Sequence, residues 1–163
     1  MAVDYTAAFI YSFITTVGFA VLFHAPRTSL ATSGFIGAVG WIIFVHIGKE
    51  LGHSSFYANL IATIAIALMS ELSARIAREP STIFVIPGVI PLVPGLGMYQ
   101  GMTKFIEKNY DAGMAILLTA ITDAMAIALG IMLVTSVFRV LLIRRRRKHK
   151  ELLALQTQKE QSR

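Results

Sequence analysis

The chain has 163 residues, of which 55% are hydrophobic, and its mean hydropathy of +0.66 is too high for a water-soluble domain of ordinary composition. Its net charge of +6 arises entirely in residues 144–163, where eight Lys or Arg stand against two Glu. No aromatic residue interleaves this basic cluster, which argues against a nucleic-acid partner. Since the chain contains no cysteine, disulfides, thiol catalysis and Cys-ligated metals are excluded. The composition therefore predicts an integral membrane protein.

We predict an all-α polytopic domain over residues 1–143, made of about five transmembrane helices, and a basic cytoplasmic tail over residues 144–163. The predicted spans are residues 5–23, 31–47, 56–76, 81–101 and 112–140. The first span lacks the basic n-region and the small-residue cleavage site of a signal peptide, so we interpret it as an uncleaved helix.

The second predicted span contains Gly34, Gly37 and Gly40, which would let the backbone of a neighbouring helix approach closely. The connection before it, which contains His24 and Pro26, is short. We therefore expect the first two spans to be antiparallel neighbours.

The fourth predicted span has the sequence PGVIPLVPGLG over residues 87–97, and three prolines with three glycines cannot form one regular helix. A break inside the bilayer leaves backbone groups unpaired, at several kcal/mol each, unless protein, water or a ligand satisfies them. In secondary transporters such breaks bind substrate and act as hinges. The alternative is a kinked packing helix whose free carbonyls are bridged by Ser or Thr from neighbouring helices.

The residues that we predict to line the substrate path are Pro87, Gly88, Pro91, Pro94, Gly95, Tyr99 and Gln100. If the helix resumes near Gly95, Tyr99 and Gln100 lie in its first turns beside the break, where a hydroxyl and an amide could orient a polar ligand. The GxxxG spacing of Gly97 and Gly101 favours close helix packing instead.

Ionisable residues within the spans are candidates for proton coupling. Asp123 lies near the middle of the fifth span, where a carboxylate costs roughly 2.5–3.5 kcal/mol on insertion scales. Either it couples transport to protons or it makes a structural hydrogen bond to Ser or Thr of another helix. Glu71 is the second candidate, but Arg75 stands one turn away, so a structural ion pair is favoured. No metal-ligand spacing, nucleophile–base pair or phosphate-binding loop is present, so we expect no metal, no cofactor and no enzyme activity.

The distribution of Lys and Arg selects a topology, because they accumulate in short cytoplasmic loops. Five crossings with the N-terminus outside place Arg27, Arg75, Arg78 and the tail inside. If residues 81–101 re-enter instead, four crossings remain, and these three arginines move outside together with two lysines of the later loop. Five crossings fit better. The tail could also bind anionic lipid headgroups.

The segment VIPGVIPLVPGLGMYQGM, residues 85–102, resembles the signature of the threonine/serine exporter (ThrE-like) family. The chain is similar in particular to the small YjjB-like subunit, because GFAVLFHAP, residues 18–26, matches the end of that subunit's first helix. The similarity covers roughly residues 5–143 and leaves out the tail. Asp123 is not part of the recognised motif.

This resemblance implies gradient-driven export of small polar or carboxylate metabolites across a bacterial plasma membrane, threonine and serine in some members and succinate in two-component ones. It also implies a larger, separately encoded YjjP-like membrane subunit as the partner, and it marks Pro87, Gly88, Pro91, Pro94, Gly95 and Tyr99 as the functional core.

We therefore expect the small subunit of a two-component secondary exporter, with protons as the favoured driving ion. The alternative is a non-transporting scaffold that stabilises a partner transporter. Transport by a homo-oligomer of this chain is a further possibility.

Overall fold

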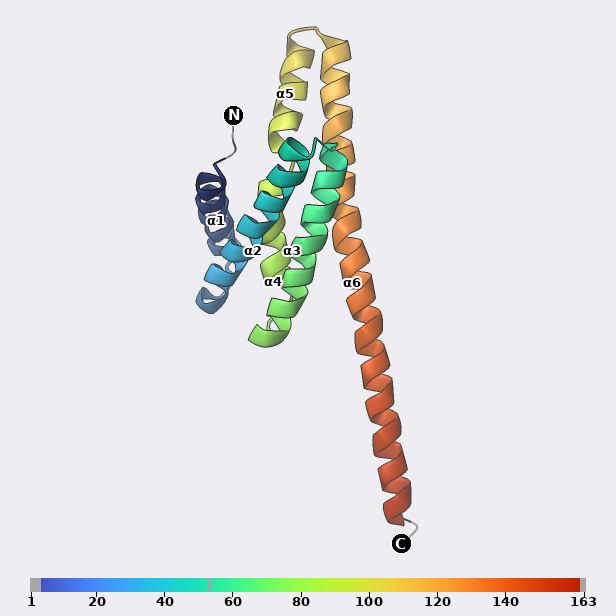
Figure 1. The fold of residues 1–163 in the computed structure, drawn as a ribbon. Helices are drawn as coiled ribbons and strands as arrows, with labels where there is room; N and C mark the ends of the chain where they lie inside the picture. The colour runs from blue at the N-terminus through green and yellow to red at the C-terminus, as the bar shows by residue number, and fades with distance from the viewer. Residues whose placement is uncertain (1–3, 53, 162–163) are drawn as a thin grey trace.

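The computed structural model describes residues 4–52 and 54–161, and all regular structure within these ranges is helical (Figure 1). The helices are α1 (Tyr5–Leu22), α2 (Arg27–Val45), α3 (Ser55–Ala77), α4 (Thr82–Val89), α5 (Gly95–Ile106) and α6 (Tyr110–Gln161), with a π-helical turn η1 (His46–Glu50) and a 3₁₀ turn η2 (Ile90–Leu92). The prediction of an all-α polytopic membrane protein is confirmed.

Local chemistry explains where several helices begin and end. Asp4 caps α1, since its carboxylate accepts hydrogen bonds from the backbone N–H groups of Thr6 and Ala7 at 3.1 and 3.2 Å. The second helix begins at Arg27, directly after Pro26 and before the apolar run that we predicted as the span. The third helix ends at Ala77, and the following residue, Arg78, adopts the left-handed conformation with φ of 59°.

The first two helices are antiparallel neighbours, as the short connection predicted. Gly34 and Gly37 lie against α1, where an added Cβ would collide with Val17 and Thr16 respectively, and Gly40 lies against α3. The predicted close approach at these glycines is therefore confirmed. Small residues let helix backbones come close enough to pack well within a bilayer, where lipid removes the usual hydrophobic driving force.

The core lies between α2, α3, α4 and α6. α4 packs against α1, α2 and α3, and α6 runs along α3. Phe84 of α4 has no exposed surface and lies at the centre of this core. The buried apolar cluster consists of Ile36, Ala62, Ile66, Ala74, Phe84, Leu92 and Ile127.

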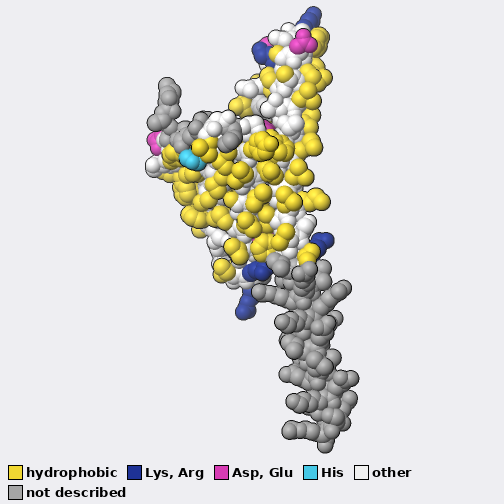
Figure 2. Space-filling view, turned by 45° about the vertical axis from the view of Figure 1, so that its right-hand side comes forward, with side chains coloured by type: hydrophobic (Ala, Val, Ile, Leu, Met, Phe, Trp, Pro, Cys, Tyr) yellow, Lys and Arg dark blue, Asp and Glu magenta, His cyan; other side chains and the backbone are white. Residues whose placement is uncertain are grey.

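The outer surface is apolar around its middle and charged at its two ends. Figure 2 shows a largely hydrophobic surface over the helices, with Lys and Arg at its lower edge and both basic and acidic side chains at its top. Large apolar side chains within the spans, such as Ile14 of α1 and Met132 of α6, are more than 60% exposed, which suits a surface covered by lipid. Helices α1, α2 with η1, α3 and α6 are each long and apolar enough to cross a membrane.

The fourth predicted span is formed by α4, η2 and α5, which bend by 44° at the break. A bend of this size does not reverse the chain, so α4 starts beside the end of α3 and α5 finishes at the opposite end of the molecule (Figure 1). The geometry favours a broken crossing over a re-entrant loop.

Helix α6 crosses the bundle over Tyr110–Val140 and continues to Gln161. The side chains of residues 141–163 lie outside the described part of the structure, so the predicted lipid contacts of the basic tail stay a prediction.

Candidate functional site

The break in the fourth span contains three prolines in three different structural positions. Pro87 lies inside α4 and is buried, Pro91 lies in the 3₁₀ turn, and Pro94 directly precedes α5. Gly88 is also buried, and an added Cβ there would lie 3.1 Å from Ile66 of α3. The first half of the motif therefore packs in the core.

The carbonyl left free by Pro87 has a partner from another helix. A proline lacks the N–H that would bind the carbonyl four residues earlier, which for Pro87 is that of Ile83. Ser33 of α2 donates its hydroxyl to this Ile83 oxygen at 3.4 Å. Around Pro87, therefore, the structure agrees with the alternative prediction of a kinked packing helix. A serine of a neighbouring helix bridges its free carbonyl.

The other two prolines are accommodated by tighter turns. The carbonyl of Pro87, which Pro91 cannot bind, accepts the N–H of Ile90. The carbonyl of Ile90, which Pro94 cannot bind, accepts the N–H of Val93 at 3.1 Å. The break is therefore internally hydrogen-bonded at these three carbonyls, so in this conformation they need no ligand.

The helix resumes at Gly95, as expected, and Tyr99 and Gln100 follow in its first turns. Their side chains are exposed rather than turned into the bundle, and that of Tyr99 is 70% exposed. Gly95 is also exposed and has open space around it. The second half of the motif thus forms a surface, whereas the first half forms part of the core.

The glycines of the GxxxG spacing hold α5 against α6. An added Cβ at Gly97 would lie 3.6 Å from Ala120, and one at Gly101 would lie 2.7 Å from Leu117. The prediction of close helix packing here is confirmed.

Asp123 is buried between α3 and α6, only 7% exposed. Its Oδ2 accepts a hydrogen bond of 2.6 Å from Ser55, the first residue of α3, whose hydroxyl also lies 3.4 Å from the amide nitrogen of Asn59. The Asp123 Oδ1 and the Asn59 Oδ1 are buried without a hydrogen-bond partner within the described residues. Ala120, which faces Gly97, stands one turn before Asp123, so this carboxylate lies close to the level at which α5 resumes.

Glu71 does not join this cluster. It lies 16 residues after Ser55 on α3, which is roughly 24 Å along the helix axis. The expected ion pair between Glu71 and Arg75 is wrong for the described structure, because Arg75 instead places its guanidinium carbon 4.6 Å from the ring centroid of Phe138 on α6. The aromatic face offers the guanidinium a cation–π contact across the helix pair, which an intrahelical pair would not.

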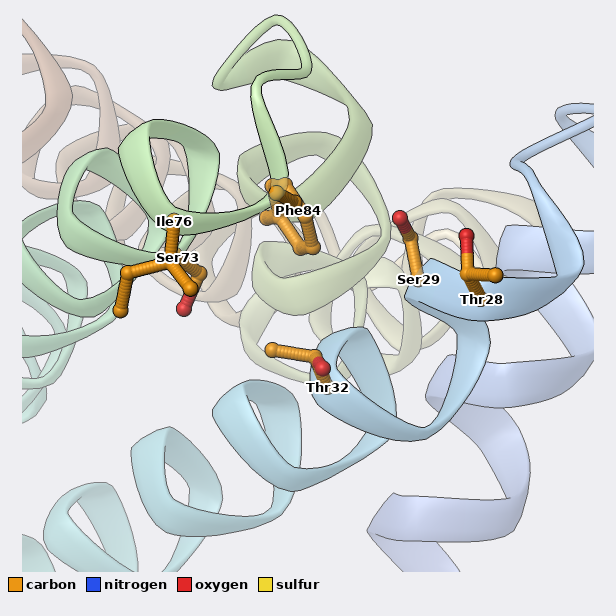
Figure 3. Close-up of a pocket in the computed structure, with 7 residues that line it drawn as sticks. Thr28, Ser29, Thr32, Ser73, Ile76 and Phe84 are labelled. Atoms are coloured by element: carbon orange, nitrogen blue, oxygen red, sulfur yellow. The ribbon is translucent and has the colours of Figure 1, made fainter.

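A cavity of about 470 Å³ lies where α2 begins, α3 ends and α4 begins. Figure 3 shows Phe84 of α4 between the end of α3, with Ser73 and Ile76, and the first turns of α2. The hydroxyl residues lining it are Thr28, Ser29, Thr32 and Ser73. The sequence did not indicate this site, although three of these hydroxyl residues stand within residues 28–32, because the packing of α3 and α4 against α2 brings the lining together.

The profile of the family described as "Threonine/Serine exporter, ThrE" matches residues 8–137. The chain belongs to the threonine/serine exporter family. The match includes the whole broken span, Asp123 and the hydroxyl cavity, so all three features lie within the family's own domain.

The chain is similar to a probable threonine/serine exporter of Mycobacterium tuberculosis (strain ATCC 25618 / H37Rv), with 25% identity over 68% of this chain and 21% of that protein. It is 29% identical to the threonine/serine exporter of Corynebacterium glutamicum over 74% of this chain and 24% of the relative. An uncharacterized protein of Haemophilus influenzae (strain ATCC 51907 / DSM 11121 / KW20 / Rd) is 26% identical over 62% and 34%. The chain thus matches only about a fifth to a third of the length of these relatives. No solved structure matches it significantly.

Proposed function

We propose that this chain is the small subunit of a two-component secondary exporter of threonine- or serine-type amino acids or succinate-type dicarboxylates, driven by an ion gradient for which protons are the first candidate. The observation that carries the proposal is the broken span of a threonine/serine exporter family member. Its first half is fixed in the core, and its second half packs mainly against one helix, α6. An element divided in this way can hinge at Pro91 and Pro94 while the bundle stays intact.

The need for a larger partner is supported by an apolar face of α5 that the described helices leave uncovered. On this face, Leu96, Tyr99 and Ile106 are 70–83% exposed. A YjjP-like membrane subunit that covers α5 would complete the substrate path around Gly95, Tyr99 and Gln100.

Asp123 is the proposed coupling residue. Its Oδ1 is buried and unpartnered in the described structure, so a bound proton or cation there would complete the site. The carboxylate also lies close to the level at which α5 leaves the break, because Ala120, one turn earlier on α6, faces Gly97. Its charge state could therefore act on the proposed hinge.

The proposed orientation places the N-terminus outside and the tail in the cytoplasm. Arg75, near the end of α3, contacts Phe138 of α6, and the hydroxyl cavity joins the end of α3 to the start of α2. Arg27, the first residue of α2, and Arg78, which follows α3, therefore lie at the same end of the bundle. The basic residues of this end support its cytoplasmic placement. The opposite end carries the ion pair of Lys104 with Glu107 at 2.7 Å.

Counterflow of labelled threonine, serine and succinate in liposomes tests the proposal. We expect exchange when the chain is reconstituted with its larger partner, and no exchange from either subunit alone. Liposomes that contain the Asp123→Asn variant of this chain together with the partner serve as a control. Exchange should continue in them, because exchange needs no net coupling, whereas uphill export should stop. The absence of exchange with both subunits present would contradict the proposal.

The alternative is a scaffold role. The hydrogen-bonded carbonyls of the break support it, because α4 can then serve as an ordinary packing helix that needs no ligand. A scaffold would stabilise the partner through its helices without lining the path. It predicts that the prolines of the break can be replaced without loss of transport.

A further inference from the structure

The cavity at the meeting point of α2, α3 and α4 combines opposite helix ends around an uncharged, hydroxyl-rich lining. None of its seven lining residues, all within the described part of the chain, is ionisable. Its volume of about 470 Å³ falls within the range of about 300–1,000 Å³ that is typical of small-molecule sites. A ligand here would have to be recognised by dipoles and hydroxyls rather than by side-chain charges.

One side of the cavity is the N-terminal end of α2. Pro26 precedes this helix and supplies no side-chain cap. The N–H of Ser29 donates to the Pro26 carbonyl at 2.8 Å, which leaves the N–H groups of Arg27 and Thr28 without an acceptor among the described residues. Ser29, in the same first turn, is only 2% exposed, and its hydroxyl has no hydrogen-bond partner in the described structure although it lines the cavity. Leaving a buried hydroxyl unpaired is costly, so its partner is expected to be a ligand or water. The helix end and this hydroxyl together suit a carboxylate.

The other side is the C-terminal end of α3. Ile76 and Ala77 of the last turn line the cavity, and no backbone hydrogen bond within the described ranges reaches their carbonyls. The nearby carbonyl of Ala74 is already used by the N–H groups that follow the helix. Carbonyls at a helix C-terminus carry partial negative charge and suit an ammonium group.

We propose that this cavity binds the zwitterionic head of a small neutral amino acid, with its carboxylate at the α2 end beside Ser29 and its ammonium at the α3 end. The inference rests on the proposed transport function, and it selects amino acids over dicarboxylates as the ligand class. A dicarboxylate brings two negative charges to a lining with no cation, whereas a zwitterion matches one positive and one negative helix end. Phe84 lies between these ends and directly precedes the broken motif, so the bound head contacts the element that leads to the break.

The chain has no cysteine, so a single introduced thiol reports on this cavity alone. Thr32→Cys places a thiol on the cavity lining. Thr82→Cys places a matched thiol at an exposed position of α4 that does not line the cavity. The full chain in lipid nanodiscs is treated with a charged methanethiosulfonate reagent in the presence of saturating L-serine, 2-aminoethanol, 3-hydroxypropanoate or succinate. Because all lining residues belong to this chain, the partner is not required.

We expect L-serine to slow modification of Thr32→Cys about tenfold, with little effect at Thr82→Cys. 2-Aminoethanol and 3-hydroxypropanoate, which each lack one charged group of serine, should leave the modification rate unchanged. Succinate should also leave it unchanged. Adding Ser29→Ala should abolish most of the protection, whereas Ser136→Ala, on the exposed face of α6, should not. No protection at Thr32→Cys, equal protection at both thiols, or equal protection by succinate would overturn the proposal.

This assay does not read transport. Protection by L-serine together with failed counterflow would leave the amino-acid site standing and remove the exporter function. Counterflow without protection would leave the exporter standing and remove the cavity as its recognition site.

Discussion

The two halves of the broken span differ in almost every physical respect. α4 carries buried Pro87 and Gly88 and packs against three helices, while α5 carries exposed Gly95 and Tyr99 and packs mainly against α6. The same motif thus holds one half-helix in the core and leaves the other in contact mainly with one helix, α6. The comparison teaches that the prolines separate a fixed segment from one that can move or receive a partner.

The largest effect on stability is expected from the anchored half. Phe84→Ala removes a side chain with no exposed surface and should lower the free energy of unfolding by about 3 kcal/mol. Tyr99→Ala, in the second half, should change it by less than about 0.5 kcal/mol in the isolated chain. Thermal or denaturant unfolding in nanodiscs measures both. Equal losses would show that α5 is as firmly packed as α4.

A second large effect, on coupling rather than stability, is expected at Asp123. Asp123→Asn should abolish proton-driven uphill export while counterflow continues, because the amide keeps the hydrogen bond to Ser55 but cannot exchange a proton. Ser55→Ala is the matched variant, since it removes the hydrogen bond and keeps the carboxylate. Uphill export by Asp123→Asn at the wild-type rate would reduce this residue to a structural role.

Substitutions in the interface between α5 and α6 should have a moderate effect on stability. Gly101→Val adds a side chain whose Cβ would lie 2.7 Å from Leu117, so overpacking should cost about 1–3 kcal/mol. The unfolding assay measures this loss, and cross-linking between cysteines introduced in α5 and α6 shows whether the two helices have moved apart. Unchanged stability would mean that the two helices can separate without cost.

The smallest effect on stability, with the opposite sign, is expected at Gly97, one turn before Gly101 on α5. Gly97→Ala places a methyl group 3.6 Å from Ala120, an ordinary contact, and improves helix propensity by up to about 1 kcal/mol. We expect a slight stabilisation in the same unfolding assay. A clear loss of stability would indicate that α5 must approach α6 more closely than it does here.

Much of the fold could be predicted because bilayer physics leaves few choices. Apolar length located the helices, the Gly34 and Gly37 spacing indicated close packing, and the Pro87–Gly97 segment indicated the break. The first turn of α2 was missed because its polar residues, beginning at Arg27, precede the apolar run. Hydropathy detects contact with lipid, not the helical turns that extend beyond it.

The candidate site was less predictable because it depends on contacts between distant segments. Sequence alone could not show that Ser33 satisfies the Ile83 carbonyl, or that Asp123 meets Ser55 rather than a residue of the motif. Arg75 was assigned to its nearest carboxylate, yet the tertiary fold offers it Phe138. Intrahelical spacing identifies possible partners, but packing between helices decides among them.

We propose that the break moves during transport rather than serving only as a packing feature. The most direct measurement compares wild-type chain with the double variant Pro91→Ala, Pro94→Ala, each reconstituted with the larger partner, by counterflow of labelled serine and by co-purification of the two subunits. Alanine restores backbone N–H groups and favours a continuous helix, so the account predicts retained assembly with most of the counterflow lost. Retained assembly with undiminished counterflow would contradict it.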